Sequence, residues 1–295
     1  MLQYGNKFFV FFPIICYNGA GVPYGCRTEM DVQNGNGRAE RKANGTVWET
    51  GNKGEEMYTF DSRIRYSETD SEGKLSLDAL LNYFQDVSTF QSEDLGVGVA
   101  PLKERNLVWV LAYWQIVVEK YPMLCDEVKV GTFPYAFRGC MGSRNFFMTD
   151  RSGNYYAKAD SLWSLLDATT FKLSKVPQDI HDIYVMEEKL DMPYAGRKLS
   201  VPEEGIMKEA IEVKLHHLDT NKHVNNGQYV RMAGNFLPEG FVVGQMRAEY
   251  RRQARLHDKL YPFVAEYEQE GKEVWVISLR DKEGNPYVNV EFTRM

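Results

Sequence analysis

The chain has 295 residues, which is enough for two domains of about 150 residues or one large one, so a peptide-sized or disulfide-stapled scaffold is excluded. Hydrophobic residues make up 43% and charged residues 26% of the sequence, as is typical of a globular protein. A formal net charge of -6 argues against nucleic acid as a partner. The sequence also shows no run of the roughly 20 apolar residues that a membrane span requires. We therefore expect a cytoplasmic protein, with the short apolar run 8–16 leaving a secretory signal as an alternative.

Residues 1–56 differ from the rest of the sequence. Gly and Asn interrupt every helical or strand period between residues 17 and 56, which predicts an unstructured N-terminal extension. Regular patterns begin after Met57, and the codons for Gly54, Glu55 and Glu56 can form a purine-rich stretch like a bacterial ribosome-binding site. We therefore expect Met57 to be the true start, and a genuine disordered arm is the alternative.

Residues 57–175 predict one long helix followed by an antiparallel sheet. A strand-like run comes first, at residues 58–66. Apolar residues at helical spacing then predict a helix that begins after Ser76 as its N-cap and stops at Gly96. The strand-like runs that follow are at residues 107–119, 127–137, 143–150 and 155–167.

Residues 208–295 repeat this plan. A strand-like run at 209–215 precedes a shorter helix at 227–236, which Pro238 stops. The strand-like runs that follow are at residues 241–252, 260–269, 272–281 and 286–294.

Two alignments between the halves indicate an internal duplication. Asp70 aligns with Asp219 in the segment before each helix, and the hairpin sequence DRSGNYY in the first half matches DKEGNPY in the second. Residues 176–207 contain three prolines and no sustained period, so they are expected to form a connector. The predicted fold is α+β, a tandem or double hotdog in which antiparallel sheets wrap two long helices. Sheets placed edge to edge would hide each other's exposed strands.

Candidate catalytic residues occur in the second repeat only. Asp219, Asn221 and His223 stand at alternate positions just before a helix, so in extended backbone their side chains would point the same way. The aligned positions of the first repeat end in Lys74. Lysine cannot replace an imidazole as a proton shuttle near neutral pH without a large pKa shift. The second repeat is therefore expected to carry the chemistry, and the first to help form the wall of a substrate tunnel.

The string LDTNKHVNN, followed by AEYRR at residues 248–252, resembles the acyl-ACP thioesterases of plants and bacteria. The resemblance covers about residues 57–295 and implies hydrolysis of fatty acyl-acyl carrier protein, with catalytic roles for Asp219, Asn221 and His223. Plant members of this family place a Glu and a Cys immediately after EYRR, whereas this chain has Gln253 and Ala254. A cysteine nucleophile at that place is therefore excluded, and Gln253 can orient water or a partner but cannot act as a base.

A thioester needs stabilisation of the oxyanion that develops during attack. Backbone N–H groups at the start of the second helix, near Asn226 and Gly227, are candidate donors. His223 would act as a general base toward water, and direct attack by the imidazole is the alternative. Asn221 would position the thioester or the water, and Asp219 would orient the imidazole. A helix-entry cap is the alternative role for Asp219. No metal or dissociable cofactor is expected.

The expected partner is acyl carrier protein, which is acidic and carries its acyl group on a phosphopantetheine arm. Arg251 and Arg252 are candidate contacts for it, and a solvated strand edge is the alternative for these side chains. The chain would act as a monomer or homodimer. Three other functions remain open from the sequence: an acyl-CoA thioesterase, a hydroxyacyl dehydratase and a non-catalytic acyl-binding hotdog.

Overall fold

The computed structural model describes residues 57–295, so the predictions of an unstructured extension and of a start at Met57 lie outside the described residues. The first half contains β1 (Tyr58–Arg63), α1 (Leu77–Asp94), α2 (Val99–Glu104), β2 (Leu107–Val118), β3 (Glu127–Arg138), β4 (Met141–Thr149) and β5 (Tyr155–Asp167). The second contains α3 (Gln178–Ile183), β6 (Ile206–Met207), β7 (Ile211–Glu212), α4 (Asn226–Gly234), β8 (Val243–Tyr250), β9 (Lys259–Gln269), β10 (Lys272–Arg280) and β11 (Pro286–Arg294).

Helix α1 begins and ends at the positions that its sequence predicts. The Ser76 hydroxyl accepts a hydrogen bond from the Ala79 N–H at 3.3 Å, as an N-cap does. Gly96, just past the helix, has a φ of +72°, a conformation in which a side chain would be strained. The apolar face of the helix, including Leu81 and Phe84, is fully buried against the sheet. The predicted caps of α1 are therefore confirmed.

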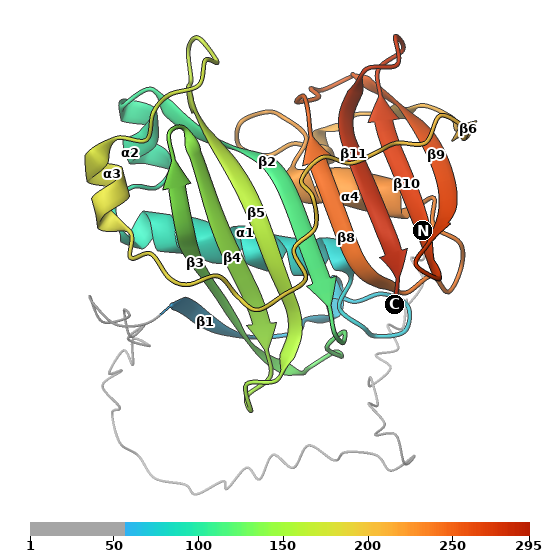
Figure 1. Cartoon of the computed structure of the whole chain (residues 1–295), viewed down its shortest axis with the longest axis horizontal. Helices are drawn as coiled ribbons and strands as arrows, with labels where there is room; N and C mark the ends of the chain where they lie inside the picture. The colour runs from blue at the N-terminus through green and yellow to red at the C-terminus, as the bar shows by residue number, and fades with distance from the viewer. Residues whose placement is uncertain (1–56) are drawn as a thin grey trace, which may run out of the picture. The chain divides into compact units, whose positions relative to one another are not determined.

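One continuous antiparallel sheet joins the two halves. Its strands follow the order β1-β3-β4-β5-β2-β8-β11-β10-β9-β6, and β7 pairs with β9. The two halves meet where β2 pairs with β8, with Trp114 opposite Ala248 and Ile116 opposite Met246. The order of the second half mirrors that of the first about this junction (Figure 1). The double hotdog is confirmed, and each half covers the edge strand of the other.

The repeated hairpins also agree with the predicted duplication. The Asp150 carboxylate accepts from the Asn154 N–H at 2.9 Å, and the Asp281 carboxylate accepts from the Asn285 N–H at 2.8 Å. In both turns a glycine with positive φ donates its N–H to the aspartate carbonyl. The two hairpins therefore form by the same local interactions.

Several predicted elements differ from the observed ones. The strand expected at 209–215 is reduced to β7, because the chain turns into a single 3-10 turn at Leu215–His217. Helix α4 has nine residues and ends at Gly234, before Pro238, so only one of the two helices is long. The short helices α2 and α3 were not expected. No helix of residues 57–295 is long and apolar enough to cross a bilayer.

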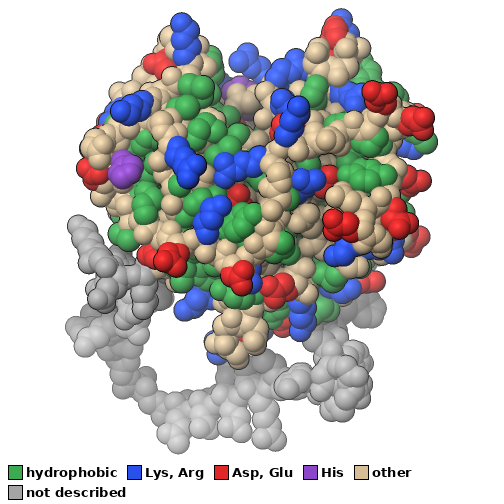
Figure 2. Space-filling view, viewed as in Figure 1, with side chains coloured by type: hydrophobic (Ala, Val, Ile, Leu, Met, Phe, Trp, Pro, Cys, Tyr) green, Lys and Arg blue, Asp and Glu red, His purple; other side chains and the backbone are tan. Residues whose placement is uncertain are grey.

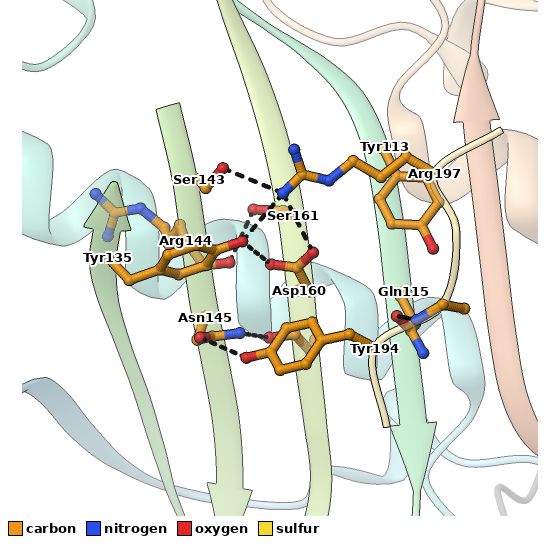
Figure 3. Close-up of polar contacts among 12 residues, drawn as sticks. Tyr113, Gln115, Tyr135, Ser143, Arg144, Asn145, Asp160, Ser161, Tyr194 and Arg197 are labelled. Atoms are coloured by element: carbon orange, nitrogen blue, oxygen red, sulfur yellow. Dashed lines mark hydrogen bonds and ion pairs between the residues drawn. The ribbon is translucent and has the colours of Figure 1, made fainter. Parts of the chain in front are cut away.

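The connector between the halves lies over the outer face of the first half's sheet, on a layer of polar side chains (Figure 3). The Gln115 amide is fully buried, donates to the Pro193 carbonyl at 2.6 Å and accepts from the Ala195 N–H at 2.9 Å. The buried Asp160 accepts from the Tyr135 hydroxyl at 2.7 Å, and burial raises the pKa of its carboxyl group. The Gln115 bonds, together with the ion pair between Asp160 and Arg197 of the connector, hold the connector on the outer face, on the side of the sheet opposite to α1.

Candidate active site

The segment before α4 forms a tight turn around the Asp219 carboxylate. The Asp219 N–H donates to the His223 carbonyl at 2.8 Å, and Lys222 between them has a φ of +63°. Asp219 Oδ1 accepts from the backbone N–H groups of Asn221 at 2.8 Å and His223 at 3.3 Å. The carboxylate therefore positions Asn221 and His223 through their backbone.

The His223 ring is partly buried on the wall of a large cavity. Its Nδ1 atom is sealed from solvent and has no hydrogen-bond partner among the described residues. The Asp219 carboxylate, which was expected to orient the imidazole, therefore makes no hydrogen bond to Nδ1. Burial lowers the pKa of His223, the charge of Arg255 lowers it further, and the Asp219 carboxylate partly opposes both. The imidazole is therefore neutral near pH 7, the form that can accept a proton.

The start of α4 supplies one free backbone donor. Asn225 is the N-cap, and its side chain accepts from the Gly227 N–H at 2.8 Å. Gly227 is therefore not free to stabilise an oxyanion, which corrects that prediction. Asn226 lines the cavity, and its backbone N–H has no acceptor among the described residues. Asn226 remains the candidate oxyanion donor, supported by the positive end of the helix dipole.

Tertiary hydrogen bonds fix Asn226 from two sides. Its side-chain Nδ2 donates to Gln85 Oε1 on α1 at 3.1 Å, and its carbonyl accepts from the hydroxyl of the partly buried Tyr250 on β8 at 3.1 Å. The start of α4 is thus tied to the first repeat and to the central sheet. Neither Gln85 nor Tyr250 could be identified from the local motif, because both contacts are long-range.

Gln253 reaches the site because its neighbour is bonded to the turn. The Val224 N–H donates to the Ala254 carbonyl at 3.0 Å, and the Ala254 N–H donates to the Tyr229 hydroxyl at 2.7 Å. These bonds hold the segment after β8 beside the turn at residues 219–223, and Gln253 lines the same cavity as His223. The structure thus brings Asp219, Asn221, His223 and Gln253 to one cavity wall.

The two predicted carrier contacts are already engaged within the chain. Arg251 pairs with Glu249 at 2.8 Å. Arg252 pairs with Asp281 at 2.7 Å, and its guanidinium lies 4.5 Å from the centre of the Tyr287 ring. Arg255 also lines the cavity, but its guanidinium forms no ion pair with any of residues 57–295. The sequence alone could not show that Arg251 and Arg252 form ion pairs within the protein whereas Arg255 does not.

The cavity has a volume of about 1040 Å³ and is lined by both repeats. The second repeat contributes the turn at residues 219–223, the start of α4 and residues 250–253 and 255. The first contributes the face of α1 from Gln85 to Glu93, part of α2 and the beginning of β2. This volume is at the upper end of ligand pockets, and its walls carry both apolar and polar side chains. A long, narrow ligand could therefore lie along α1 with one end at His223.

The doubled sheet and a single histidine at one large cavity define a double-hotdog protein with one candidate site. The chain belongs to the acyl-ACP thioesterase family: the family's N-terminal domain matches residues 55–184 and its C-terminal domain matches residues 201–293. This confirms the family that the sequence motifs indicated.

Relatives and solved structures agree with this assignment. The chain is 26% identical over 207 residues to the chloroplastic palmitoyl-acyl carrier protein thioesterase of Arabidopsis thaliana, covering 64% of this chain and 50% of the relative. It is 24% identical over 218 residues to the dodecanoyl-[acyl-carrier-protein] hydrolase of Cinnamomum camphora, covering 67% of this chain and 56% of that one. The chain thus spans about half the length of the curated relatives that it matches.

Two solved structures share the fold. An acyl-ACP thioesterase from Bacteroides thetaiotaomicron superposes with a TM-score of 0.73 at 20% identity, covering 80% of this chain and 97% of that one. The 12:0-ACP thioesterase from Umbellularia californica superposes with a TM-score of 0.71 at 22% identity, covering 81% of this chain and 94% of that one.

Proposed function

We propose that the protein hydrolyses the thioester of fatty acyl-acyl carrier protein and releases a free fatty acid. The observation that carries this proposal is the position of the His223 imidazole on the wall of a cavity of about 1040 Å³ that both repeats line. Membership of the acyl-ACP thioesterase family supports the same reaction.

The mechanism uses water as the nucleophile. His223 Nδ1 is sealed, so Nε2 is the ring nitrogen that a water in the cavity can reach. Nε2 takes a proton from water as the water oxygen attacks the thioester carbonyl carbon. The C–S bond then breaks, and the departing sulfur takes the proton from the imidazolium. The Asn226 N–H stabilises the oxyanion, and Asn221 orients the water or the carbonyl.

A thiol-release assay with residues 57–295 and the full chain tests the reaction. Purified acyl-ACP and acyl-CoA of several chain lengths serve as substrates. We expect faster turnover of acyl-ACP, and His223→Ala should lower kcat by about a hundredfold or more. The matched control is Lys74→Ala, at the aligned position of the first repeat, which should leave kcat unchanged. Near-normal turnover by His223→Ala would refute the role of the imidazole, and preference for acyl-CoA would favour the alternative substrate.

The charge distribution supports an acidic carrier. Arg255 and Lys103, which form no ion pair with any of residues 57–295, both line the cavity. Exposed acidic residues that do not line the cavity follow one another along β9 and the turn after it: Glu266, Glu268 and Glu270. Red side chains also gather at the right-hand edge of the face shown in Figure 2. A negatively charged partner would therefore be attracted to the cavity and repelled from β9.

Added salt tests this steering. We expect kcat/KM for acyl-ACP to fall as ionic strength rises, and Arg255→Glu to weaken that dependence. The measurement belongs at about pH 8, where His223 is neutral in both proteins. The control is Arg252→Gln, which removes an engaged cation and should leave the salt dependence near that of the wild type. A rate indifferent to salt would contradict charge steering.

A further inference from the structure

A charged side chain lies on the cavity wall without a charged partner. Arg144 on β4 is 8% exposed and lines the cavity. Its Nη1 donates to Thr132 Oγ1 at 3.2 Å and to Gln91 Oε1 on α1. The ion pairs of residues 57–295 do not include Arg144. Figure 3 shows its guanidinium pointing away from the polar groups that hold the connector.

Two donors of this guanidinium, Nε and Nη2, form no hydrogen bond of normal geometry with residues 57–295, and neither is among the sealed polar atoms that lack a partner. The Tyr184 side chain is close enough to stabilise the charged guanidinium. The Tyr184 ring lies 5.4 Å from the guanidinium carbon, and its hydroxyl is bonded to Ser92. Burial lowers the pKa of Arg144, but a guanidinium keeps its proton in proteins. The cavity wall therefore presents a cation with unused N–H groups.

The two walls of the cavity differ in polarity near Arg144. The α1 side presents polar residues, Gln85, Ser88, Thr89 and Ser92. The opposite side presents large apolar residues, Leu107, Trp109, Leu111 and Phe137. A fully saturated chain suits the apolar side. It would, however, exclude water from the Arg144 N–H donors without accepting hydrogen bonds from them, and leaving such donors unsatisfied costs free energy.

Helix α1 gives the depth of Arg144 in the cavity. Gln85 is bonded to Asn226 at the catalytic end, and Gln91 is bonded to Arg144 six residues further along the helix. At the helical rise this separation is about 9 Å. An extended chain covers that distance in roughly seven bonds, at about 1.2 Å per bond. Arg144 therefore faces the middle of a long acyl chain or the end of a medium one.

We propose that Arg144 is a specificity residue that binds a hydrogen-bond-accepting oxygen on the acyl chain, about seven bonds beyond the thioester. This proposal rests on the proposed acyl-ACP hydrolysis and adds the substrate class. A hydroxyl oxygen and a terminal carboxylate oxygen share the required chemistry, and the carboxylate would form the stronger, charge-assisted bonds.

The kinetic test compares three acyl-ACP substrates. They are a saturated chain, the same chain with a hydroxyl at that depth, and a dicarboxylic chain whose free carboxylate falls there. We expect the wild type to favour at least one oxygenated chain by about tenfold in kcat/KM. Arg144→Met should remove this preference, and Arg144→Lys should retain part of it for the carboxylate. The control is Arg280→Met, which removes a guanidinium that stacks on Phe263 outside the cavity and should leave the preference unchanged.

A binding measurement separates this proposal from the proposed function. Calorimetry with the His223→Ala protein and the corresponding free acids reports on Arg144 without any hydrolysis. Tighter binding of an oxygenated acid, lost in His223→Ala/Arg144→Met, supports the proposal even if no acyl-ACP is hydrolysed. Equal binding of saturated and oxygenated acids overturns it, as does a preference that survives Arg144→Met. Should Arg144→Met fail to fold in a thermal melt, Arg144→Lys with the same ligands gives the deciding comparison.

Discussion

The turns that precede α1 and α4 share one backbone geometry and carry different side chains. The Asp70 N–H donates to the Lys74 carbonyl at 2.8 Å, as the Asp219 N–H does to the His223 carbonyl. Asp70 Oδ1 accepts from the N–H groups of Glu72 and Lys74 at 2.9 and 3.0 Å, which repeats the bonds of Asp219. The aspartate is thus a structural residue of the turn in both repeats.

The residues that the turn presents have diverged. Lys74 pairs with its neighbour Glu72 at 2.6 Å and does not line the cavity, whereas His223 does. Both copies therefore keep the turn, and only the second places an imidazole on the cavity wall. Among residues 57–295, the side chains of Asn221 and His223 form no hydrogen bond to another residue.

The two helices differ in length and in how much of the cavity they line. Helix α1 has 18 residues, and its second half lines the cavity together with α2. Helix α4 has nine residues, and only its first turn, from Asn226 to Tyr229, lines the cavity. The first repeat thus supplies most of the length of the cavity, and the second supplies the candidate catalytic groups at one end.

Exchanging the diverged residues should give the largest effect. His223→Lys makes the second turn resemble the first, and we expect kcat to fall by about a hundredfold or more, because an ammonium cannot accept a proton near neutral pH. Lys74→His should add no activity, since that position lies outside the cavity. Steady-state thiol release by both variants and by the double exchange measures these effects. Activity restored by Lys74→His in the His223→Lys protein would show that the first turn can reach the substrate.

The shared role of the two aspartates predicts a smaller, graded effect. Asp219→Ala and Asp70→Ala each remove two bonds to backbone N–H groups, so each should lower the free energy of unfolding by about 1–3 kcal/mol. Only Asp219→Ala should also lower kcat, because its turn holds His223. Asp219→Asn keeps an accepting oxygen, so we expect it to retain most of the activity. Denaturant unfolding and thiol release compare the three variants, and a loss in Asp219→Asn as large as in Asp219→Ala would mean that the carboxylate charge acts on the ring.

The fold was largely predictable because its signals are local. Helical spacing, the Ser76 cap and the Gly96 stop defined α1, and the two glycine hairpins revealed the duplication. The short helices α2 and α3 escaped prediction because each has only six residues and no side-chain cap.

The candidate site was predictable in its residues but not in its bonding. Alternate spacing identified Asp219, Asn221 and His223, because these neighbours share one turn. The spacing could not show that Asn225 occupies the Gly227 N–H or that Arg252 is bound to Asp281. It also could not show that Arg144 and His223 line one cavity, because the two residues belong to different repeats and lie far apart in the sequence.

The pH dependence gives the smallest expected effect. The activity requires a neutral imidazole, so kcat/KM should rise with pH as His223 loses its proton and reach a plateau near neutrality. Burial and the charge of Arg255 both lower the pKa of His223, which places this rise below the ordinary histidine range near pH 6.5.

Arg255→Ala removes a positive charge, stabilises the imidazolium and moves the rise to higher pH. Activity at about pH 6 should therefore fall more than activity at about pH 8, whereas Lys259→Ala, an exposed cation that does not line the cavity, should leave the profile unchanged. A profile that is identical in wild type and Arg255→Ala would show that another group controls the rate.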